Sequence, residues 1–465
     1  MSKPRLLSDI AELGDTLERI APRILWLPGN TNRIDAVEAL LWERASRFAG
    51  LRVVQLLSLG KGWSKAIPHI RLVTPFIGPG ARELVHRGFA DFLPCHLSFF
   101  PSLTRPGPHG TRGRYQPDVA IAHVSRPDPL GRVTLGLDAG LSWEPVQHAR
   151  ITIAVMNSQM PKFVSEPIMT ERYRGKPLAS GCAMPLDAFD YVLEHDAPLM
   201  AHPASTASEE ALAIGKRIAS HFDQHGKPLI QKGATLQLGI GDIPDGILRA
   251  LESRTDLELG IHSEMISDGV LRLMRAGVIT GRRKTLLRNK VVIGFAIGSN
   301  ELYDALEDPE FVILPQEFVN DPHIVARSPR MTSINGALAV SLLGDVCASH
   351  IGHLPYSGIG GARDFALGAH ASDGGRSIIA LPSTYTDRAT GRLASRITLA
   401  LPEGSHVTVN YDTAQFIATE HGVAELEGMT ISERINAMIG IAHPAFRESL
   451  AHDANARWGF RIAYV

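Results

Sequence analysis

The sequence predicts an α/β protein with two domains of similar, open architecture and mainly parallel sheets. The chain has 465 residues, more than one hydrophobic core ordinarily holds. Short β-branched runs alternate with amphipathic helical stretches, which is typical of βα units. The order of helix, strand and helix near the N-terminus also returns in the second half of the chain.

The N-terminal half supplies the first βα units. A helical pattern over residues 36–48 (AVEALLWERASRF) precedes an apolar run at 51–59, and further strands are predicted at 118–124 and 151–157. Residues 102–117 are rich in proline and glycine and are predicted to form a loop. Its three arginines are interpreted as a solvated surface, with contact to an anionic ligand as the alternative.

A polar, proline-containing passage at residues 194–210 is predicted to link the two domains. A new amphipathic helix follows at 210–222, and a strand at 234–241 (ATLQLGIG) leads into another helix. We therefore expect an N-terminal domain over residues 1–205 and a C-terminal domain over residues 206–465.

Composition restricts the class of partner. A formal net charge of −1 provides no basic surface for nucleic acid or anionic membrane, so small molecules or proteins are the expected partners. Cys95, Cys182 and Cys347 are too few for a disulfide framework, which fits a reducing compartment. No apolar run approaches the ~18 residues that a membrane span needs, and the first 20 residues lack the apolar core of a signal peptide. We expect a cytoplasmic protein.

A first glycine turn follows the predicted strand at 234–241. Gly239 and Gly241 stand at the strand end, and Pro244 lies near the start of the next helix. Backbone amides at such a turn can face an anion or a developing oxyanion. A dinucleotide-binding fingerprint would need its third glycine at Pro244, whereas Gly246 comes two residues later. NAD binding is therefore disfavoured.

Glu264 is a carboxylate at the end of a run that reads as a strand (LELGIHS). In open parallel sheets, ligands bind at the carboxyl ends of strands, so Glu264 is expected to project into a cleft. Capping of the following helix is an alternative that the residues leave open, although Asp268 is better placed to act as the cap.

A second glycine loop, YSGIGGARDFALGA, precedes another helical pattern. Gly358, Gly360 and Gly361 allow the backbone to approach a bulky ligand closely, and an ordinary strand-to-helix turn is the alternative. Cys347, His350 and His353 lie at three-residue intervals, but a fourth metal ligand is not apparent, so no metal is expected. The absence of a G-x-S-x-G motif disfavours a serine hydrolase.

A series of motifs in this order resembles the acetyl-CoA hydrolase/transferase family of class I CoA-transferases, which includes 4-hydroxybutyrate CoA-transferases. In the C-terminal half they are LQLGIGDIPDGIL, GIHSEMISDGV, MTSINGAL, SGIGGARDF, SIIALPST and TEHGVAEL. In the N-terminal half they are DVAIAHVSRPDPLGRVTLG and VMNSQMP. The resemblance covers most of the chain.

The resemblance implies two similar open α/β domains with the active site between them, and it implies that Glu264 is the nucleophile. A glutamate side chain is ordinarily ionised at neutral pH and needs no base to attack an acyl-CoA thioester. The resulting acyl-glutamyl anhydride would be converted by CoA to a glutamyl-CoA thioester, with ping-pong kinetics. CoA is then a substrate, and no cofactor is expected. The partners are an acyl-CoA and a small carboxylic acid, and the resemblance also suggests a homodimer.

The resemblance also assigns roles to the two glycine segments. The backbone amides of Ile240 and Gly361 would form the oxyanion hole, and Asn320 would be an auxiliary catalytic amide beside the glutamate. The expected contacts of CoA are Gly239, Gly241, Asn335, Gly358, Gly360 and Gly361. For Asn335, a role as a buried turn asparagine is an equal alternative.

Residues 162–190 and 410–416 depart from the family pattern, the latter by carrying Tyr411 and Thr413. If these segments shape the pocket, the preferred acid differs from acetate and 4-hydroxybutyrate. The sequence leaves three functions open: a CoA-transferase, an acyl-CoA hydrolase that passes the anhydride to water, and a non-catalytic acyl-CoA sensor.

Overall fold

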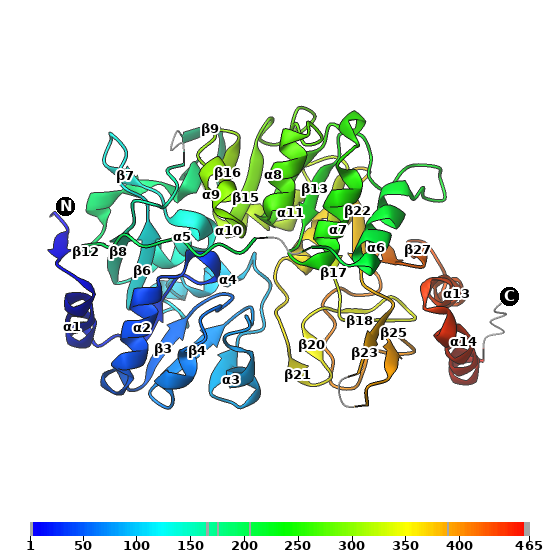
Figure 1. Cartoon of the computed structure of the whole chain (residues 1–465), viewed down its shortest axis with the longest axis horizontal. Helices are drawn as coiled ribbons and strands as arrows, with labels where there is room; N and C mark the ends of the chain where they lie inside the picture. The colour runs from blue at the N-terminus through cyan, green and yellow to red at the C-terminus, as the bar shows by residue number, and fades with distance from the viewer. Residues whose placement is uncertain (1–2, 164–166, 174–175, 204–205, 388–389, 460–465) are drawn as a thin grey trace. The chain divides into compact units, whose positions relative to one another are not determined.

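The computed structural model describes residues 3–163, 167–173, 176–203, 206–387 and 390–459 (Figure 1). Its contacts divide the chain into two compact units. Unit 1 comprises Met1–Pro203 and Lys290–Asn320, and unit 2 comprises Ala204–Asn289 and Asp321–Val465. The segment at 290–320 thus groups with the N-terminal residues, although it lies inside the expected C-terminal domain. The expected domain bounds of 1–205 and 206–465 stay a prediction.

Unit 1 is built on an eight-stranded sheet in which every neighbouring pair is parallel. From edge to edge the strands are β1 (Arg5–Leu7), β12 (Tyr191–Glu194), β8 (Ile151–Met156), β6 (Val119–Val124), β2 (Ile24–Trp26), β3 (Leu51–Val54), β4 (Ile70–Thr74) and β5 (Ala90–Phe92). Strands buried on both faces explain the continuous apolar runs in the sequence, for instance VAIAHV in β6.

The first helix of unit 1 begins at a side-chain cap. α1 (Ile10–Ile20) starts after Asp9, whose side chain accepts a hydrogen bond from the Glu12 amide at 2.9 Å. The helix expected at 36–48 is shorter, because α2 (Asp35–Glu43) gives way to a 3-10 turn at Ala45–Phe48. The remaining helices are α3 (Arg82–His86), α4 (Phe100–Leu103), α5 (Ala139–His148), α9 (Asn300–Ala305) and α10 (Gln316–Val319).

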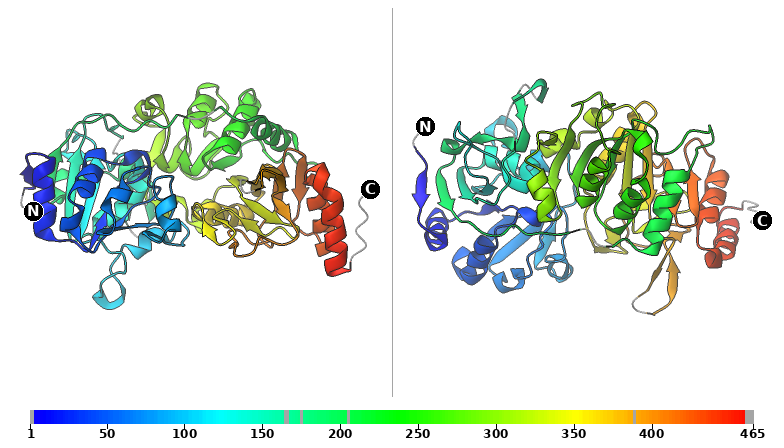
Figure 2. Two further views of the ribbon diagram at one scale, coloured as in Figure 1. Left: turned by 60° about the horizontal axis from the view of Figure 1, so that its bottom comes forward. Right: turned by 45° about the horizontal axis from the view of Figure 1, so that its top comes forward.

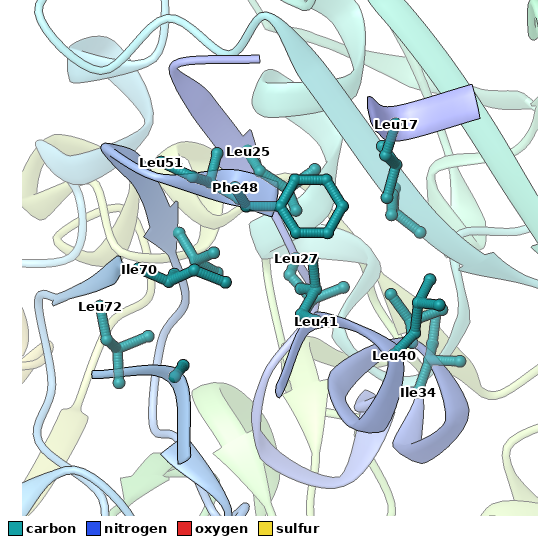
Figure 3. Close-up of a cluster of buried hydrophobic side chains, with 14 of the residues drawn as sticks. Leu17, Leu25, Leu27, Ile34, Leu40, Leu41, Phe48, Leu51, Ile70 and Leu72 are labelled. Atoms are coloured by element: carbon teal, nitrogen blue, oxygen red, sulfur yellow. The ribbon is translucent and has the colours of Figure 1, made fainter. Parts of the chain in front are cut away.

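The core of unit 1 forms where these helices meet the sheet. Leucine side chains of α1 and α2 pack against those of β2, and β3 and β4 close the cluster (Figure 3). Leu17, Leu25, Leu27 and Leu41 are completely buried. Full burial of one such side chain stabilises the fold by about 1.5–3 kcal/mol, so this cluster fixes the positions of the strands.

Within unit 2, six strands run in the order β14, β13, β17, β22, β26 and β27. All neighbours are parallel except the final hairpin of β26 and β27. The strands are β14 (Gly260–Ile266), β13 (Thr235–Leu238), β17 (Met331–Gly336), β22 (Arg376–Ala380), β26 (Phe416–Thr419) and β27 (Gly422–Glu425). The predicted α/β class with mainly parallel sheets is confirmed.

The strand order of unit 2 reverses between β13 and β17. The crossover through α7 (Asp242–Leu251) leads from β13 to β14, and the crossover through α12 (Ala362–Ala371) leads from β17 to β22 in the opposite direction. Because parallel crossovers are right-handed, the two helices cover opposite faces of the sheet. Ligands of proteins with this architecture usually bind at the carboxyl ends of the strands beside such a reversal, which here are β13 and β17.

Helix α6 (Glu209–Ser220) begins after Ser208, which accepts a hydrogen bond from the Ala211 amide at 3.1 Å. Gly246 of α7 faces α6 so closely that a β-carbon there would lie 2.4 Å from the Ala211 carbonyl oxygen. This glycine thus serves helix packing. The other helices of unit 2 are α8 (Asp268–Arg275), α11 (Pro322–Val325), α13 (Ile431–Ile441) and α14 (Pro444–Trp458), the last two drawn in red in Figure 2.

The remaining strands complete the fold. In unit 1 they are β7 (Arg132–Val133), β9 (Pro167–Tyr173), β10 (Lys176–Ala179), β11 (Met184–Pro185), β15 (Val291–Ala296) and β16 (Phe311–Ile313). In unit 2 they are β18 (Ala339–Ser341), β19 (Val346–Cys347), β20 (His350–Ile351), β21 (Leu354–Pro355), β23 (Thr384–Thr386), β24 (Leu393–Ser395) and β25 (Ile397–Thr398). In the described part of the chain, no helix combines the length and apolarity that a membrane crossing requires.

Candidate active site

The first glycine turn joins β13 to α7. Gly241 adopts φ +111° and ψ −171°, a conformation that is essentially restricted to glycine. A β-carbon at Gly241 would meet no atom within 4 Å, so backbone conformation and not space requires the glycine. The side chain of Ile240 is 44% exposed, which leaves this turn accessible at the carboxyl end of its strand.

Glu264 lies on β14, two residues before the strand ends. It is partly exposed, whereas its neighbours Ser263 and Met265 are buried. The helix-capping alternative is wrong, because the N-cap position of α8 is occupied by Ser267. The expectation that Asp268 caps this helix is also wrong, since Asp268 is the first residue of α8.

Ser263 connects the strand of Glu264 to the first glycine turn. The backbone pairing of β13 with β14 extends only as far as Leu236 and Ile261. Beyond that point the Ser263 hydroxyl accepts a hydrogen bond from the Leu238 amide at 3.3 Å and donates one to the Leu238 carbonyl at 3.2 Å. The serine therefore holds the two strand ends together directly before Gly239.

Asn335 lies at the reversal point of the strand order. Its side-chain amide exchanges two hydrogen bonds with Gln237 of β13, at 3.0 and 3.1 Å. The interpretation as a turn asparagine is wrong, because Asn335 belongs to β17 and pairs with Ile379. Both amides are buried, so the pair fixes the distance between β13 and β17 near the carboxyl ends of these strands.

The second glycine loop follows β21 and ends at α12. Gly360 has φ +56°, and Gly361 occupies the N-cap position, where its carbonyl accepts a hydrogen bond from the Phe365 amide at 2.9 Å. The start of the loop is held by Ser349, whose carbonyl accepts from the amides of Tyr356 and Ser357 at 2.8 and 3.2 Å. Gly358, Gly360 and Gly361 are all buried.

A ring contact relates this loop to the glutamate. His262 of β14 packs edge to face on Phe365 of α12, with ring centroids 6.3 Å apart. Side chains alternate along a strand, so Glu264 lies on the same face as His262, about 7 Å further towards the carboxyl end. Helix α12 runs antiparallel to the strands. Gly361, four residues before Phe365, therefore lies about 6 Å nearer to the carboxyl ends of the strands than Phe365 does. Glu264 and the first amides of α12 are thus at similar heights on one face.

Asn320 belongs to unit 1 and directly follows α10. It is buried, and its Oδ1 accepts a hydrogen bond from the Gln316 side chain at 2.6 Å. Arg105 anchors this helix by donating to Glu317 of α10 and, at 2.6 Å, to Glu144 of α5. Despite its burial, the pKa of Glu144 is lowered to about 2 by His148 and Arg105. The interpretation of Arg105 as a solvated surface residue is therefore wrong.

Sequence reasoning missed three polar residues near the glutamate: Ser263, Gln237 and Lys284. The Lys284 ammonium is buried and donates to the Ile261 carbonyl of β14 at 2.6 Å, and burial lowers its pKa to about 7. In the sequence, Ser263 and Gln237 are recognisable only as polar residues inside apolar strands. Burial of a polar group requires a hydrogen-bond partner, so this pattern is the signal that was available.

Other sequence patterns are used differently. The Cys347 thiol lies 3.4 Å from the His350 carbonyl oxygen, and the His350 ring packs on His406 at 4.5 Å. Among the described residues, no three acidic, histidine or cysteine side chains gather as a metal site would require.

Tyr411 lies in segment 410–416, which departs from the family pattern, and is 46% exposed beside Arg434. The second segment that departs from the family pattern, residues 162–190, contains the β9–β10 hairpin. Its residues 164–166 and 174–175 lie outside the residues that the structure describes.

Comparisons with known proteins agree with the motifs. Models of the acetyl-CoA hydrolase/transferase N-terminal and C-terminal domains match residues 23–202 and 298–454. The chain is 36% identical to 4-hydroxybutyrate coenzyme A transferase of Clostridium kluyveri, over 91% of this chain and 92% of the relative. It is 35% identical to succinyl-CoA:cyclohexane-1-carboxylate CoA transferase of Geobacter metallireducens, over 83% and 80% of the two chains.

Among solved structures, a 4-hydroxybutyrate CoA-transferase from Porphyromonas gingivalis matches with a TM-score of 0.73 and 29% identity, over 98% of both chains. Both domain models and the full-length relatives lead to one assignment, which confirms the resemblance of the ordered motifs. The chain belongs to the acetyl-CoA hydrolase/transferase family of enzymes.

Proposed function

We propose that the protein is a CoA-transferase that moves CoA between a short-chain acyl-CoA and a carboxylic acid, with Glu264 as the nucleophile. The observation that carries this proposal is a partly exposed glutamate on an otherwise buried strand, beside a glycine turn and level with the start of α12. Relatives named as CoA transferases for 4-hydroxybutyrate and for cyclohexane-1-carboxylate support the same reaction class.

The reaction proceeds by four balanced acyl transfers. The Glu264 carboxylate attacks the thioester carbonyl, a C–O bond forms, the C–S bond breaks, and CoA leaves as its thiolate. The thiolate attacks the glutamyl carbonyl of the anhydride, which releases the first acid and leaves glutamyl-CoA. The second acid attacks this thioester and displaces CoA again. Thiolate attack on the new acyl group then regenerates Glu264 and yields ping-pong kinetics.

Backbone amides of Ile240 and Gly361 are proposed to stabilise the tetrahedral oxyanions. Two rigid glycine conformations support this assignment, because Gly241 and Gly360 orient the adjoining peptide groups without side-chain adjustment. Loss of one such donor typically lowers the rate by about 10²–10³. Gly239, Gly241, Gly358, Gly360 and Gly361 are also proposed as contacts of CoA.

The two asparagines receive different proposed roles. Asn320 is proposed to hydrogen-bond an intermediate through Nδ2, because its Oδ1 already accepts a bond from Gln316 that fixes the orientation of the amide. Asn335 is proposed to position the strands beneath the proposed CoA site, because its side-chain amide is already paired with that of Gln237. CoA enters as a substrate, and no resident cofactor is part of the proposal.

The decisive experiment substitutes the nucleophile. Glu264→Ala and Glu264→Gln are expected to abolish transfer of CoA from an acyl-CoA to acetate and to a panel of other acids. After incubation with an acyl-CoA, mass spectrometry of the parent protein should find the CoA adduct on the peptide that contains GIHSEM. Hydroxylamine or borohydride should trap the same site.

An exposed glutamate of the same unit provides the control. Glu448→Gln on α14 removes an equal charge and is expected to retain full activity. Full transfer activity in either Glu264 variant would refute the proposal.

Hydrolysis is the second candidate function. The partial exposure of Glu264 favours it, because water that reaches an acyl-glutamyl anhydride would release the acid without an acceptor. Release of free CoA should be compared with and without added acid. A rate that does not depend on the acid would identify an acyl-CoA hydrolase, and a rate that needs the acid would identify a transferase.

Two further properties are proposed: a homodimer, which the family resemblance suggests, and a cytoplasmic location, which the few scattered cysteines favour. Light scattering on the purified full chain is expected to give twice the mass of 50.4 kDa. A mass equal to that of one chain would refute the dimer.

A further inference from the structure

Four solvent-exposed arginines of unit 1 line one open pocket at the amino ends of β2 and β3. The cavity, here called the arginine pocket, has a volume of about 290 Å³ and is lined by Arg23, Ile24, Arg52, Arg112, Gly113 and Arg114. Ile24 opens β2, and Arg52 is the second residue of β3. The pocket therefore lies at the amino-terminal end of these strands, opposite to the loops that follow their carboxyl ends.

The charges in this pocket are poorly compensated. Arg112 contacts the Asp118 carboxylate at 2.8 Å. The side chains of Arg23, Arg52 and Arg114 form no ion pair within 4 Å among the residues that the structure describes. Despite partial burial, hydrogen bonds from Arg112 and from the backbone keep the pKa of Asp118 below its usual value, so the carboxylate is charged. Of the four arginines that line the pocket, Arg112 is paired with Asp118. Asp91, which is itself paired with Arg71, lies within electrostatic range of Arg52.

The backbone on the sheet side of the pocket is fixed. Asp118 Oδ2 accepts hydrogen bonds from the amides of Arg23 and Ile24 at 2.8 and 3.0 Å. The Arg52 amide donates to the Arg23 carbonyl at 2.9 Å. These bonds fix the backbone of Arg23 and Arg52 in one relative position. The carboxylate that holds the Arg23 amide also binds Arg112.

The loop side of the pocket is fixed as well. Gly113 packs so tightly against the chain that a β-carbon there would lie 1.7 Å from the Arg105 carbonyl oxygen. Its amide donates to the Gln116 side chain at 3.2 Å, and Gln116 donates to the His148 carbonyl at 3.0 Å. The loop thus presents Arg112 and Arg114 on either side of an immobilised glycine.

This arrangement is suited to a phosphate group. Guanidinium groups bind phosphate oxygens with two parallel hydrogen bonds. The four arginines that line the pocket outnumber the carboxylates around them, Asp118 and the Arg71-paired Asp91. The volume falls just below the range of about 300–1,000 Å³ that is usual for whole small-molecule sites. A phosphate or diphosphate group with part of its attached sugar is therefore the size of ligand that the cavity admits.

We propose that the arginine pocket is a binding site for the phosphate or diphosphate group of a small molecule, separate from the residues assigned to acyl transfer. The inference does not depend on the proposed function, because it rests on unit 1 residues that take no part in the chemistry at Glu264. For Arg112 and Arg114 the proposal takes up the alternative that the sequence left open for the arginines at 102–117, contact with an anionic ligand.

Calorimetric titration of the full chain with inorganic pyrophosphate tests the site. The parent protein is expected to bind pyrophosphate saturably, with an affinity that falls as salt concentration rises. The double variant Arg52→Gln/Arg114→Gln is expected to bind at least about tenfold more weakly, since two charge-assisted contacts are lost. The matched control is Arg47→Gln/Arg87→Gln, which removes two exposed arginines of the same unit outside the pocket and should leave the affinity unchanged.

Further titrations identify the source of the phosphate. Binding of adenosine 3′,5′-bisphosphate or of CoA that competes with pyrophosphate would support a nucleotide ligand, and binding of pyrophosphate alone would support a free polyphosphate. No saturable binding, equal weakening in both double variants, or binding of RNA without binding of pyrophosphate would each overturn the proposal. Glu264→Gln should bind pyrophosphate as the parent does, and Arg52→Gln/Arg114→Gln should retain acyl transfer, so the two proposals fail independently.

Discussion

At the scale of single residues, the hydroxyl of Ser263 has a larger structural role than its small size suggests. It replaces the backbone pairing that β13 and β14 abandon beyond Leu236, and it does so one residue before the proposed nucleophile. A strand end that carries a reacting group must hold it to within a fraction of an ångström, because positioning contributes strongly to rate. Ser263 is therefore a positioning residue in the proposed reaction.

Ser263→Ala is expected to lower kcat for acyl transfer while changing KM little. Its unfolding free energy should fall by about 1–3 kcal/mol, because the Leu238 backbone groups lose their partner in a buried setting. Steady-state kinetics and urea unfolding measure both effects. Ser333→Ala is the matched control: Ser333 is a buried serine on β17 whose hydroxyl has no hydrogen-bond partner in the described structure. Equal behaviour of the two variants would contradict the role of Ser263.

At the scale of elements, the contact between α6 and α7 explains a glycine that sequence patterns alone leave ambiguous. Gly246 comes too late for a dinucleotide fingerprint, yet its position is required because α6 crosses directly over it. The facing residue, Gly215, has the same restriction, since a β-carbon there would lie 2.4 Å from the Gly246 carbonyl oxygen. Close packing of these helices sets where α7 begins and hence where the first glycine turn lies.

Gly246→Ala is expected to destabilise the protein by about 1–3 kcal/mol, because the added methyl group collides with backbone atoms that cannot move independently. Gly440→Ala provides the contrast. Gly440 lies in α13, where a β-carbon would meet no atom within 4 Å. This second substitution should stabilise the protein by up to about 1 kcal/mol through helix propensity. Thermal unfolding of both variants, followed by circular dichroism, provides the measurement, and destabilisation by both would refute the packing argument.

Secondary-structure patterns located elements better than they located their ends. The helix expected at 36–48 exists but ends at Glu43 before a 3-10 turn, and the strand that begins at Leu51 ends at Val54. Leu57 then has φ +51°, which no sequence pattern indicates for a leucine. Apolar periodicity reports which residues face a core, whereas the end of an element depends on tertiary neighbours.

At the scale of the whole molecule, buried titratable groups make stability depend on pH. His123 is buried in unit 1 between the Asn32 carbonyl at 3.0 Å and the Asn157 side chain at 3.1 Å. Burial lowers the pKa of His123 to about 4, against about 6.5 in an unfolded chain. The unfolded state therefore binds more protons between these values, and stability is lost as pH falls from about 6.5 to about 4.

The substitution His123→Gln isolates the contribution of this histidine to the pH dependence of stability. The stability advantage of the parent protein over this variant is expected to decline by about 3 kcal/mol between pH 7 and pH 4. Urea unfolding followed by tryptophan fluorescence is suitable, because four of the five tryptophans belong to unit 1: Trp26, Trp42, Trp63 and Trp143.

Asp138→Asn provides a control of opposite sign. Burial raises the pKa of Asp138 to about 7, so its contribution to stability is present at low pH and is lost as pH rises towards 7. The advantage of the parent over Asp138→Asn should therefore grow on acidification. A parent–variant difference that is constant with pH for His123→Gln would contradict the prediction.

The sequence by itself determined the α/β class and the family, because ordered motifs and apolar periodicity are properties of the chain that survive without its folded neighbours. It also marked Glu264, since a lone carboxylate in an apolar strand is visible locally. Only the tertiary structure decided that Ser263 joins the end of β13, that Asn335 pairs with Gln237, and that arginines from three separate segments line one pocket. Each of these contacts joins residues that are distant along the chain, and such contacts arise from packing that no local pattern encodes.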